Sequence, residues 1–167
     1  MKLILHIGLP KTGTTSLQSA LAASRSELRD QGILYPDFGI EGLENHQLLL
    51  RPICEDSGLV DGVWDPQLKG KYLELEAIKR HLYDEAARTK AHTIVLSSET
   101  FTGRHAFFEQ RIERLDLAQY AKQLFSDFSQ IEIVVCLRNQ VEWLESCYIE
   151  AIKGGHFFEA GGAPTGP

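Results

Sequence analysis

The sequence predicts an α/β protein in which helices flank a central parallel sheet of about four strands. Short apolar runs alternate along the chain with longer segments whose apolar residues recur at helical spacing. Return to a parallel strand needs a long crossover, usually a helix, so this alternation favours a parallel sheet. The 167 residues, 43% hydrophobic and 24% charged, have the composition of one globular domain. We expect that domain to cover residues 1–153.

The first half of the chain predicts two strands and two helices: a strand over 3–7, a helix over 16–31, a strand over 33–36 and a short helix over 46–53. Leu17, Leu21 and Leu28 share one face of the first helix. Gly32 suits the end of this helix, because glycine readily takes the left-handed conformation found there. Pro36 ends the second strand, since proline has no N–H for a ladder.

The second half predicts the rest of the sheet and its helices. In chain order these are a helix over 71–90, a strand over 93–98, a helix over 116–128, a strand over 131–137 and a helix over 139–153. Asp116 and Asn139 have the side-chain oxygens that cap helix N-termini. Residues 154–167 are rich in glycine and proline, which is typical of a flexible tail or of a chain cut short.

Ligands of a parallel sheet bind beyond the carboxyl ends of its strands, so the residues that follow the strands are candidates for a site. Lys11–Thr15 follow the first strand, Ser98 and Glu99 follow the third, and Arg138 follows the fourth. Although they are far apart in sequence, we expect these residues to face one crevice.

The segment after the first strand has the frame of a phosphate-binding loop. Gly8 and Gly13 are separated by four residues and Thr14 and Thr15 follow, but the lysine stands at position 11 instead of directly after the second glycine. The backbone N–H groups of such a turn, with the positive end of a helix dipole, attract an anion. We therefore expect a phosphate-like ligand, held without the lysine that serves the β- and γ-phosphates of ATP.

The composition limits the classes of ligand and partner that this chain is expected to bind. The formal net charge of -6 argues against binding to nucleic acid or to an anionic membrane, so an anionic ligand needs a small local site. Cys54, Cys136 and Cys147 form neither a disulfide framework nor a C-x-x-C motif, which favours a reducing, cytoplasmic compartment. No stretch is long enough for a membrane span, and the apolar run at residues 3–7 is too short for a signal peptide. The oligomeric state stays open.

Two motifs together indicate a family. Pro-Lys-Thr-Gly-Thr-Thr-Ser-Leu at residues 10–17 resembles the 5′-phosphosulfate loop of sulfotransferases that use 3′-phosphoadenosine 5′-phosphosulfate (PAPS). Members of that family bind the donor's 3′-phosphate with an arginine at a later strand end and a serine eight residues on, the spacing of Arg138 and Ser146. Residues 6–15, 32–36 and 138–146 are similar to bacterial members, and the resemblance covers roughly residues 3–153.

The resemblance implies a three-layer, P-loop-like fold and transfer of a sulfuryl group from PAPS to a hydroxyl or amine of a carbohydrate or small molecule. The product nucleotide would be 3′-phosphoadenosine 5′-phosphate (PAP). The 5′-phosphosulfate would be held by the loop, with Lys11 as the catalytic cation; the residues concerned are Pro10, Lys11, Thr12, Gly13, Thr14 and Thr15. No metal is expected, because a sulfuryl group carries less negative charge than a γ-phosphoryl group and one cation with backbone donors could serve it.

A sulfotransferase also needs a base for the acceptor's proton, which in the family is a histidine or a glutamate. His46 is the first choice, because histidine titrates near neutral pH and the irregular segment around it borders the expected crevice. Glu99 is the second choice, at the end of the third strand. His6 lies within the first strand, where a residue at the edge of the core is expected.

Two other functions remain open. A nucleotide kinase or other NTPase could use the same fold, although Thr14 then stands where the P-loop lysine belongs. A truncated or non-catalytic domain could bind the nucleotide without turnover, because family members continue past the last helix with a basic loop and no arginine or lysine follows Lys153 here.

Overall fold

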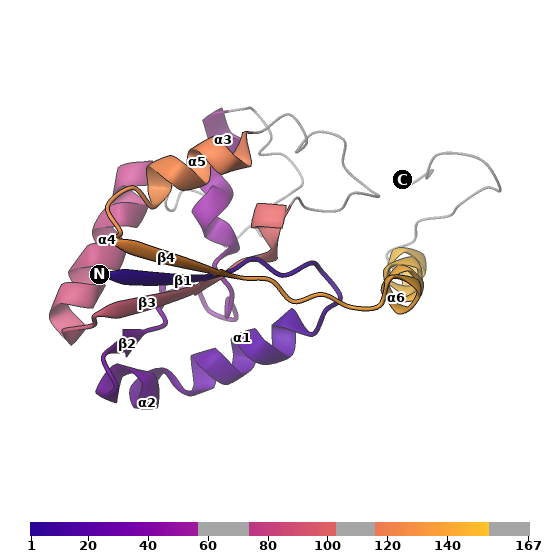
Figure 1. Cartoon of the computed structure of the whole chain (residues 1–167), viewed down its shortest axis with the longest axis horizontal. Helices are drawn as coiled ribbons and strands as arrows, with labels where there is room; N and C mark the ends of the chain where they lie inside the picture. Colours follow the sequence, from indigo (N-terminus) through magenta and orange to yellow (C-terminus); the bar gives the residue numbers. More distant parts are fainter. Residues whose placement is uncertain (57–73, 103–115, 154–167) are drawn as a thin grey trace.

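The computed structural model describes residues 1–56, 74–102 and 116–153. Its centre is a four-stranded, all-parallel sheet with the strand order β2-β3-β1-β4 (Figure 1). The strands are β1 Lys2–His6, β2 Ile33–Leu34, β3 Thr93–Ser97 and β4 Gln130–Val134. The expected α/β fold with a parallel sheet is confirmed. The carboxyl ends of β1, β3 and β4 meet at one edge, where His6 pairs with Ser97 on one side and Val134 on the other.

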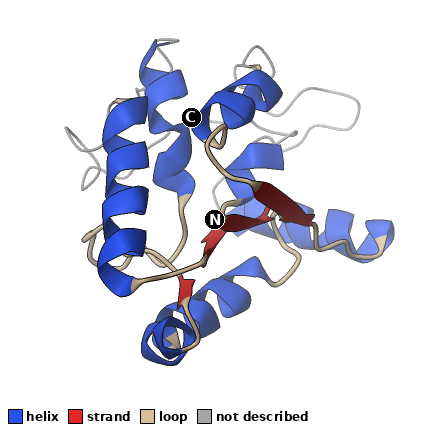
Figure 2. Ribbon diagram, turned by 60° about the vertical axis from the view of Figure 1, so that its left-hand side comes forward, coloured by secondary structure: helices blue, strands red, loops and turns tan. Residues whose placement is uncertain are grey.

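Six α-helices and two 3-10 helices lie among the described residues, and Figure 2 shows them around the strands. They are α1 Thr14–Ala23, α2 Arg25–Asp30, η1 Gln47–Leu50, α3 Arg51–Asp56, α4 Leu75–Thr89, η3 Glu99–Thr102, α5 Leu117–Leu124 and α6 Gln140–Lys153. In Figure 1, α1 and α2 lie below the strands, α3 and α5 lie above them, and α6 stands to the right, apart from the other helices.

The predicted helix over 16–31 is in fact two helices. The chain departs from helical geometry at Ser24 (φ -95°, ψ 17°), whose N–H still donates to the Ala20 carbonyl before α2 begins. The expected helix end is confirmed at Gly32, which has a φ of 72°. A side chain at Gly32 would also meet the His92 ring at 2.7 Å. Both Asp116 and Asn139 accept backbone N–H groups at the starts of their helices, from Gln119 at 2.8 Å and Val141 at 3.0 Å.

The strand predicted over 131–137 ends early, at Val134. The Ile7 N–H donates to the Val134 carbonyl at 2.9 Å, and beyond this bond β1 turns away into the loop. Residues 135–139 therefore have no neighbouring strand to pair with on that side. The tail predicted for residues 154–167 lies outside the described residues.

The core lies around β1, β2 and β3. Its fully buried side chains come from those strands, from η1, from one face of α4 and from α5; they are Leu3, Leu34, Leu48, Leu49, Leu50, Ile78, Leu82, Ile94, Leu96 and Leu124. Apolar runs predicted the strands, and the helical spacing of Leu75, Ile78 and Leu82 predicted the buried face of α4. This packed region fixes the ends of β1 and β3, where the candidate site begins.

The fourth strand and the last helix are packed differently. Every residue of β4 is exposed. Large apolar side chains on β4, on the connection and on α6 are also exposed: Ile131, Ile133, Val134, Val135, Leu137, Val141, Leu144, Tyr148, Ile149 and Ile152. We call residues 130–153 the β4–α6 arm.

Candidate anion-binding site

The loop Gly8–Thr15 joins β1 to α1 and has the backbone of an anion-binding turn. Gly13, the residue before α1, is left-handed (φ 86°), and a side chain there would meet nothing within 4 Å. Its conformation, not a lack of space, therefore favours glycine. Lys11 is also left-handed (φ 65°), and the Thr12 hydroxyl donates to the Leu9 carbonyl at 2.6 Å. These features turn the chain sharply at the carboxyl edge of the sheet.

The start of α1 has neither an acidic side chain nor a side-chain cap. Unpaired N–H groups and the helix dipole favour an anion at such a terminus. Thr15 is exposed at this end, whereas the Thr14 side chain is buried toward the sheet. An anion above the loop would therefore meet backbone donors and Thr15, with Thr14 turned inward.

The sheet brings Arg138 to the loop across 127 residues of sequence. The Arg138 Nη1 donates to the Lys11 carbonyl at 3.3 Å, and its Nε donates to the Glu142 carboxylate at 3.3 Å. This meeting follows from topology, because β1 and β4 are neighbours and both end at the same edge. The Arg138 guanidinium thus lies against the backbone of the loop at Lys11.

Helix α6 adds two further contacts to the loop. The Trp143 indole N–H donates to the Pro10 carbonyl at 2.8 Å, and the Lys11 ammonium pairs with the Glu150 carboxylate at 3.2 Å. The Lys11 side chain is 36% exposed in this pair, so the ammonium is within reach of solvent. Sequence reasoning missed both partners; the only signal was their helical spacing after Arg138, which puts residues of α6 over the loop.

Ser146 lies on α6, half-buried and eight residues after Arg138. Within the part of the chain that the structure describes, no hydrogen bond joins Ser146 to the loop or to Arg138. Arg138 lies in the connection just before α6, whereas Ser146 lies within this helix.

The end of β3 supplies a second group of polar residues at this edge. The Ser98 N–H donates to the His6 carbonyl at 2.9 Å, and the hydroxyls of Ser98 and Thr100 are 2.5 Å apart. Glu99 is half-buried and begins η3 directly after this strand. Glu99 therefore lies at the same edge of the sheet as the loop.

His46, the first choice for the base, is enclosed and bonded to the backbone on both sides of its ring. The ring is buried; its Nδ1 accepts the Ser97 N–H at 2.9 Å, and its Nε2–H donates to the Pro36 carbonyl at 3.2 Å. Burial lowers the pKa of His46 from its ordinary 6.5 to about 4. Both ring nitrogens are occupied by backbone groups, so neither is free to take a proton from an acceptor.

His6 is buried at the carboxyl end of β1, next to the start of the loop. It is only 2% exposed, and its Nδ1 lies 2.8 Å from the Ser97 hydroxyl, which also accepts the Gln18 amide N–H at 3.0 Å. Burial lowers the pKa of His6 below its ordinary value. Among the described residues, the buried His6 Nε2 has no hydrogen-bond partner. A polar residue interrupting an apolar strand was the one signal available in the sequence.

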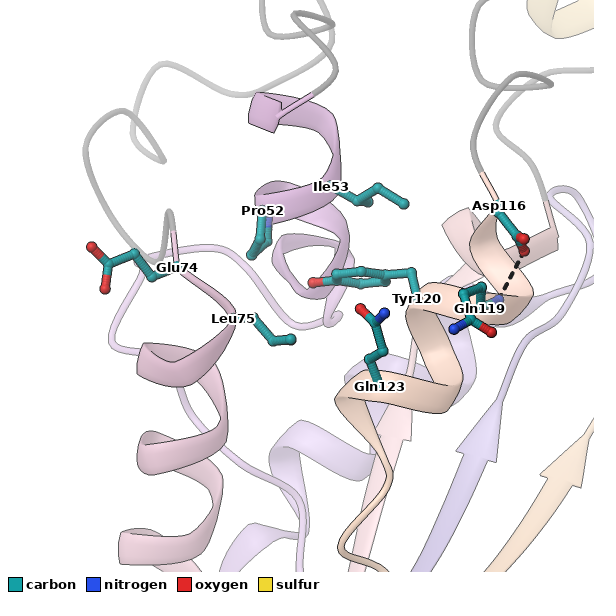
Figure 3. Close-up of a pocket in the computed structure, with 8 residues that line it drawn as sticks. All are labelled: Pro52, Ile53, Glu74, Leu75, Asp116, Gln119, Tyr120 and Gln123. Atoms are coloured by element: carbon teal, nitrogen blue, oxygen red, sulfur yellow. Dashed lines mark hydrogen bonds between the residues drawn. The ribbon is translucent and has the colours of Figure 1, made fainter.

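A separate cavity of about 480 Å³ lies between α3, α4 and α5 (Figure 3). Its lining residues are Pro52, Ile53, Glu74, Leu75, Asp116, Gln119, Tyr120 and Gln123. Two of its polar groups are already engaged: the Asp116 carboxylate caps α5, and the Tyr120 hydroxyl donates to the Leu49 carbonyl at 2.6 Å. None of the loop residues lines it.

Comparison with protein-family models, with curated proteins and with solved structures finds no match to this chain. In residues 1–56, 74–102 and 116–153, no group of three or more His, Cys, Asp or Glu residues could hold a metal ion. No helix in those ranges is long and apolar enough to cross a membrane.

Proposed function

We propose that this chain is a PAPS-dependent sulfotransferase with a P-loop-like, three-layer fold that acts on a hydroxyl or amine of a carbohydrate or small molecule. The observation that carries the proposal is the contact between Arg138 and the Lys11 carbonyl, because it joins the two motifs that resemble the family. When bound, PAPS would supply an activated sulfuryl group. The exposed start of α1 and two nearby cations fit its anionic ends.

Each site residue has a role that follows from its chemistry. Lys11 would leave Glu150 and neutralise charge on the phosphosulfate, while the N–H groups of Gly13, Thr14 and Thr15 bind its oxygens. Arg138 offers a planar fork suited to a phosphate, with Ser146 as a hydroxyl donor to the same group. These interactions orient the reacting end of the donor at the carboxyl edge of β1 and β3.

Glu99 is the remaining candidate for the base. It begins the turn after β3, at the same edge of the sheet as the loop, and a carboxylate there could accept the proton of an acceptor hydroxyl. The contacts of His46 leave that residue a structural role.

Calorimetric titration with PAP tests the nucleotide site. We expect wild type to bind, and Lys11→Ala and Arg138→Ala each to weaken binding by about tenfold or more, as for loss of a charge-assisted hydrogen bond. Lys122→Ala and Arg29→Ala are matched controls, because both side chains are exposed on helices away from the loop. Absence of PAP binding, or equal binding by all four variants, would overturn the assignment.

Two further measurements separate the alternatives. Mg²⁺-dependent binding of ATP in preference to PAP would favour an NTPase. Transfer of radiolabelled sulfate from PAPS to a panel of hydroxyl and amine acceptors distinguishes an enzyme from a binding domain. PAP binding with no transfer to any acceptor would favour the non-catalytic function, and loss of transfer in Glu99→Gln with PAP affinity retained is the result expected for the base.

A further inference from the structure

Three buried polar side chains are joined by hydrogen bonds beneath the Gly8–Thr15 loop. Gln18 comes from α1, Ser97 from the end of β3 and His6 from the end of β1, and all three are at least nine-tenths buried. The Gln18 amide N–H donates to the Ser97 hydroxyl at 3.0 Å, and that hydroxyl lies 2.8 Å from the His6 Nδ1. These hydrogen bonds thus link three elements that converge on the loop.

Counting hydrogen bonds among these three side chains favours one protonation state of His6. The Ser97 oxygen accepts the Gln18 N–H and has a second lone pair, so it could also accept from a His6 Nδ1–H; its own proton would then have no acceptor among the described residues. If the Ser97 hydroxyl instead donates to Nδ1, its proton is satisfied and the neutral imidazole carries its proton on Nε2. In that favoured state the buried Nε2 is an N–H donor, and within the described ranges it has no acceptor.

A buried donor without a partner is unfavourable because its desolvation is not compensated by a hydrogen bond, so one that persists calls for an explanation. An aliphatic residue at the end of β1 would avoid this cost. The donor lies directly below the loop: a side chain built on Gly8 would come within 2.9 Å of the His6 Nε2 and 2.7 Å of the Thr14 methyl. Any side chain at position 8 would therefore press on the His6 ring and on Thr14, so glycine allows the loop to pass directly over the donor.

We propose that His6 is an anion-binding residue of the Gly8–Thr15 loop, whose Nε2–H donates to a phosphate or sulfuryl oxygen and is held ready by Ser97 and Gln18. This inference deepens the proposed function, on which its choice of nucleotide rests. The Thr14 methyl and the Gly8 backbone cover the donor in the present structure, so a bound oxyanion must displace them slightly. Ser97 and Gln18 are positioning residues, because they act through the imidazole.

The state of the ring can be read directly by NMR on the full chain labelled with ¹⁵N-histidine. Long-range ¹H–¹⁵N spectra report which ring nitrogen carries the proton, and we expect Nε2–H for His6. On saturation with PAP, the His6 Nε2–H resonance should move as it gains an acceptor. His46 and His92 are internal references: His46 is already bonded at both nitrogens, and His92 lies at the opposite, amino end of β3.

Variants of His6 and Ser97 test the same inference through their affinity for PAP. His6→Phe keeps a planar ring and removes the donor, and we expect PAP to bind about tenfold more weakly. His6→Gln restores an N–H and should recover part of the loss. Ser97→Ala should both lower the Nε2–H population and weaken PAP binding several-fold, a paired result that a purely structural serine would not give.

The outcomes separate this inference from the proposed function. If PAP binds in a Lys11-dependent way but the His6 resonances stay fixed and His6→Phe binds normally, His6 is not an anion ligand although the nucleotide site stands. If PAP does not bind, inorganic pyrophosphate and sulfate are titrated instead; movement of His6 then supports the anion contact without the nucleotide. A Nδ1–H tautomer, or no movement with any of these probes, overturns the inference.

Discussion

Two regions along the sheet differ sharply in how they are covered. One is the packed side, by which we mean β1, β2, β3 and the helices against them, and the other is the β4–α6 arm. On β1 and β3 the side chains that face the core are almost fully buried, and helices from both halves of the chain pack against them. In the β4–α6 arm every strand residue and most large apolar side chains are exposed. The arm is attached to the body mainly through the pairing of β4 with β1 and through three contacts with the loop.

The candidate site lies across this boundary. The loop and the polar end of β3 belong to the packed side, whereas Arg138 and Ser146 belong to the arm. The contacts of Arg138, Trp143 and Glu150 with the loop therefore join a well-buried half of the site to an exposed one. Changes in the packed side should alter stability, and changes at the junction should alter ligand binding.

The largest effect should come from a matched pair of isoleucines. Ile94 in β3 is 0% exposed, whereas Ile133 in β4 is 61% exposed. Ile94→Ala should reduce the free energy of unfolding by about 2–5 kcal/mol, because it removes buried methyl groups and leaves a cavity. Ile133→Ala should change it by less than about 1 kcal/mol. Urea unfolding measures both, and similar losses would mean that the arm is covered in solution.

The second effect is a pH dependence that arises in the packed side. Because burial lowers the pKa of His46 to about 4, the unfolded chain takes up a proton at higher pH than the folded chain does. Stability is therefore fully present above pH 6.5 and is lost as the pH falls toward 4, by up to about 3 kcal/mol over that window. His6, whose pKa is also lowered by burial, contributes in the same direction.

Urea unfolding at a series of pH values checks this dependence. His46→Asn should be less stable at pH 7, since it loses ring packing and at least one backbone hydrogen bond, but its stability should vary less between pH 6.5 and 4. If the unfolding free energy of wild type and of His46→Asn changed equally with pH, the pKa of His46 would not be lowered in the folded state.

The third effect concerns the junction. Trp143→Phe keeps an aromatic ring on α6 and removes the hydrogen bond to the Pro10 carbonyl. We expect PAP binding to weaken by about threefold to tenfold, as for loss of one neutral hydrogen bond that holds the arm against the loop. Leu144→Ala is the control, since Leu144 is the next residue of the helix and is exposed. Equal affinities for wild type and Trp143→Phe would show that the arm is positioned by other contacts.

The packed side was also the more predictable one. Apolar runs located β1 and β3, and helical spacing located α4 and its buried face, because both patterns follow from which residues of an element are buried. The meeting of Arg138 with the loop followed from the rule that parallel strands end at one edge.

Other features depend on contacts between residues that are far apart in the sequence. The two partners of His46 are backbone groups 10 and 51 residues away, which no local pattern indicates, so a buried structural histidine resembled a candidate base. The early end of β4 depends on where its neighbour β1 leaves the sheet, and the Lys11–Glu150 pair depends on how α6 turns toward the loop. The break at Ser24 had no glycine or proline to signal it.

The smallest effect, and the one that tests the junction most directly, comes from the pair of Lys11 and Glu150. An exposed ion pair contributes little to stability, so Glu150→Gln should leave the unfolding free energy nearly unchanged. It should nevertheless strengthen PAP binding by about twofold to threefold, because the Lys11 ammonium no longer has to leave a carboxylate to meet the anion. Titration at 0.05 M and at 0.5 M salt measures both the effect and its screening.

Glu145→Gln is the control, because it removes the same charge from an exposed residue of the same helix that makes no described contact with Lys11. If both variants bind PAP equally more tightly, the effect comes only from the change in net charge, and Glu150 does not compete for the lysine. If only Glu150→Gln binds more tightly, and the gain shrinks at high salt, the arm regulates the charge that the loop offers to its ligand. In that case the weakly packed side of the sheet tunes the affinity of an anion site whose donors are fixed by the packed side.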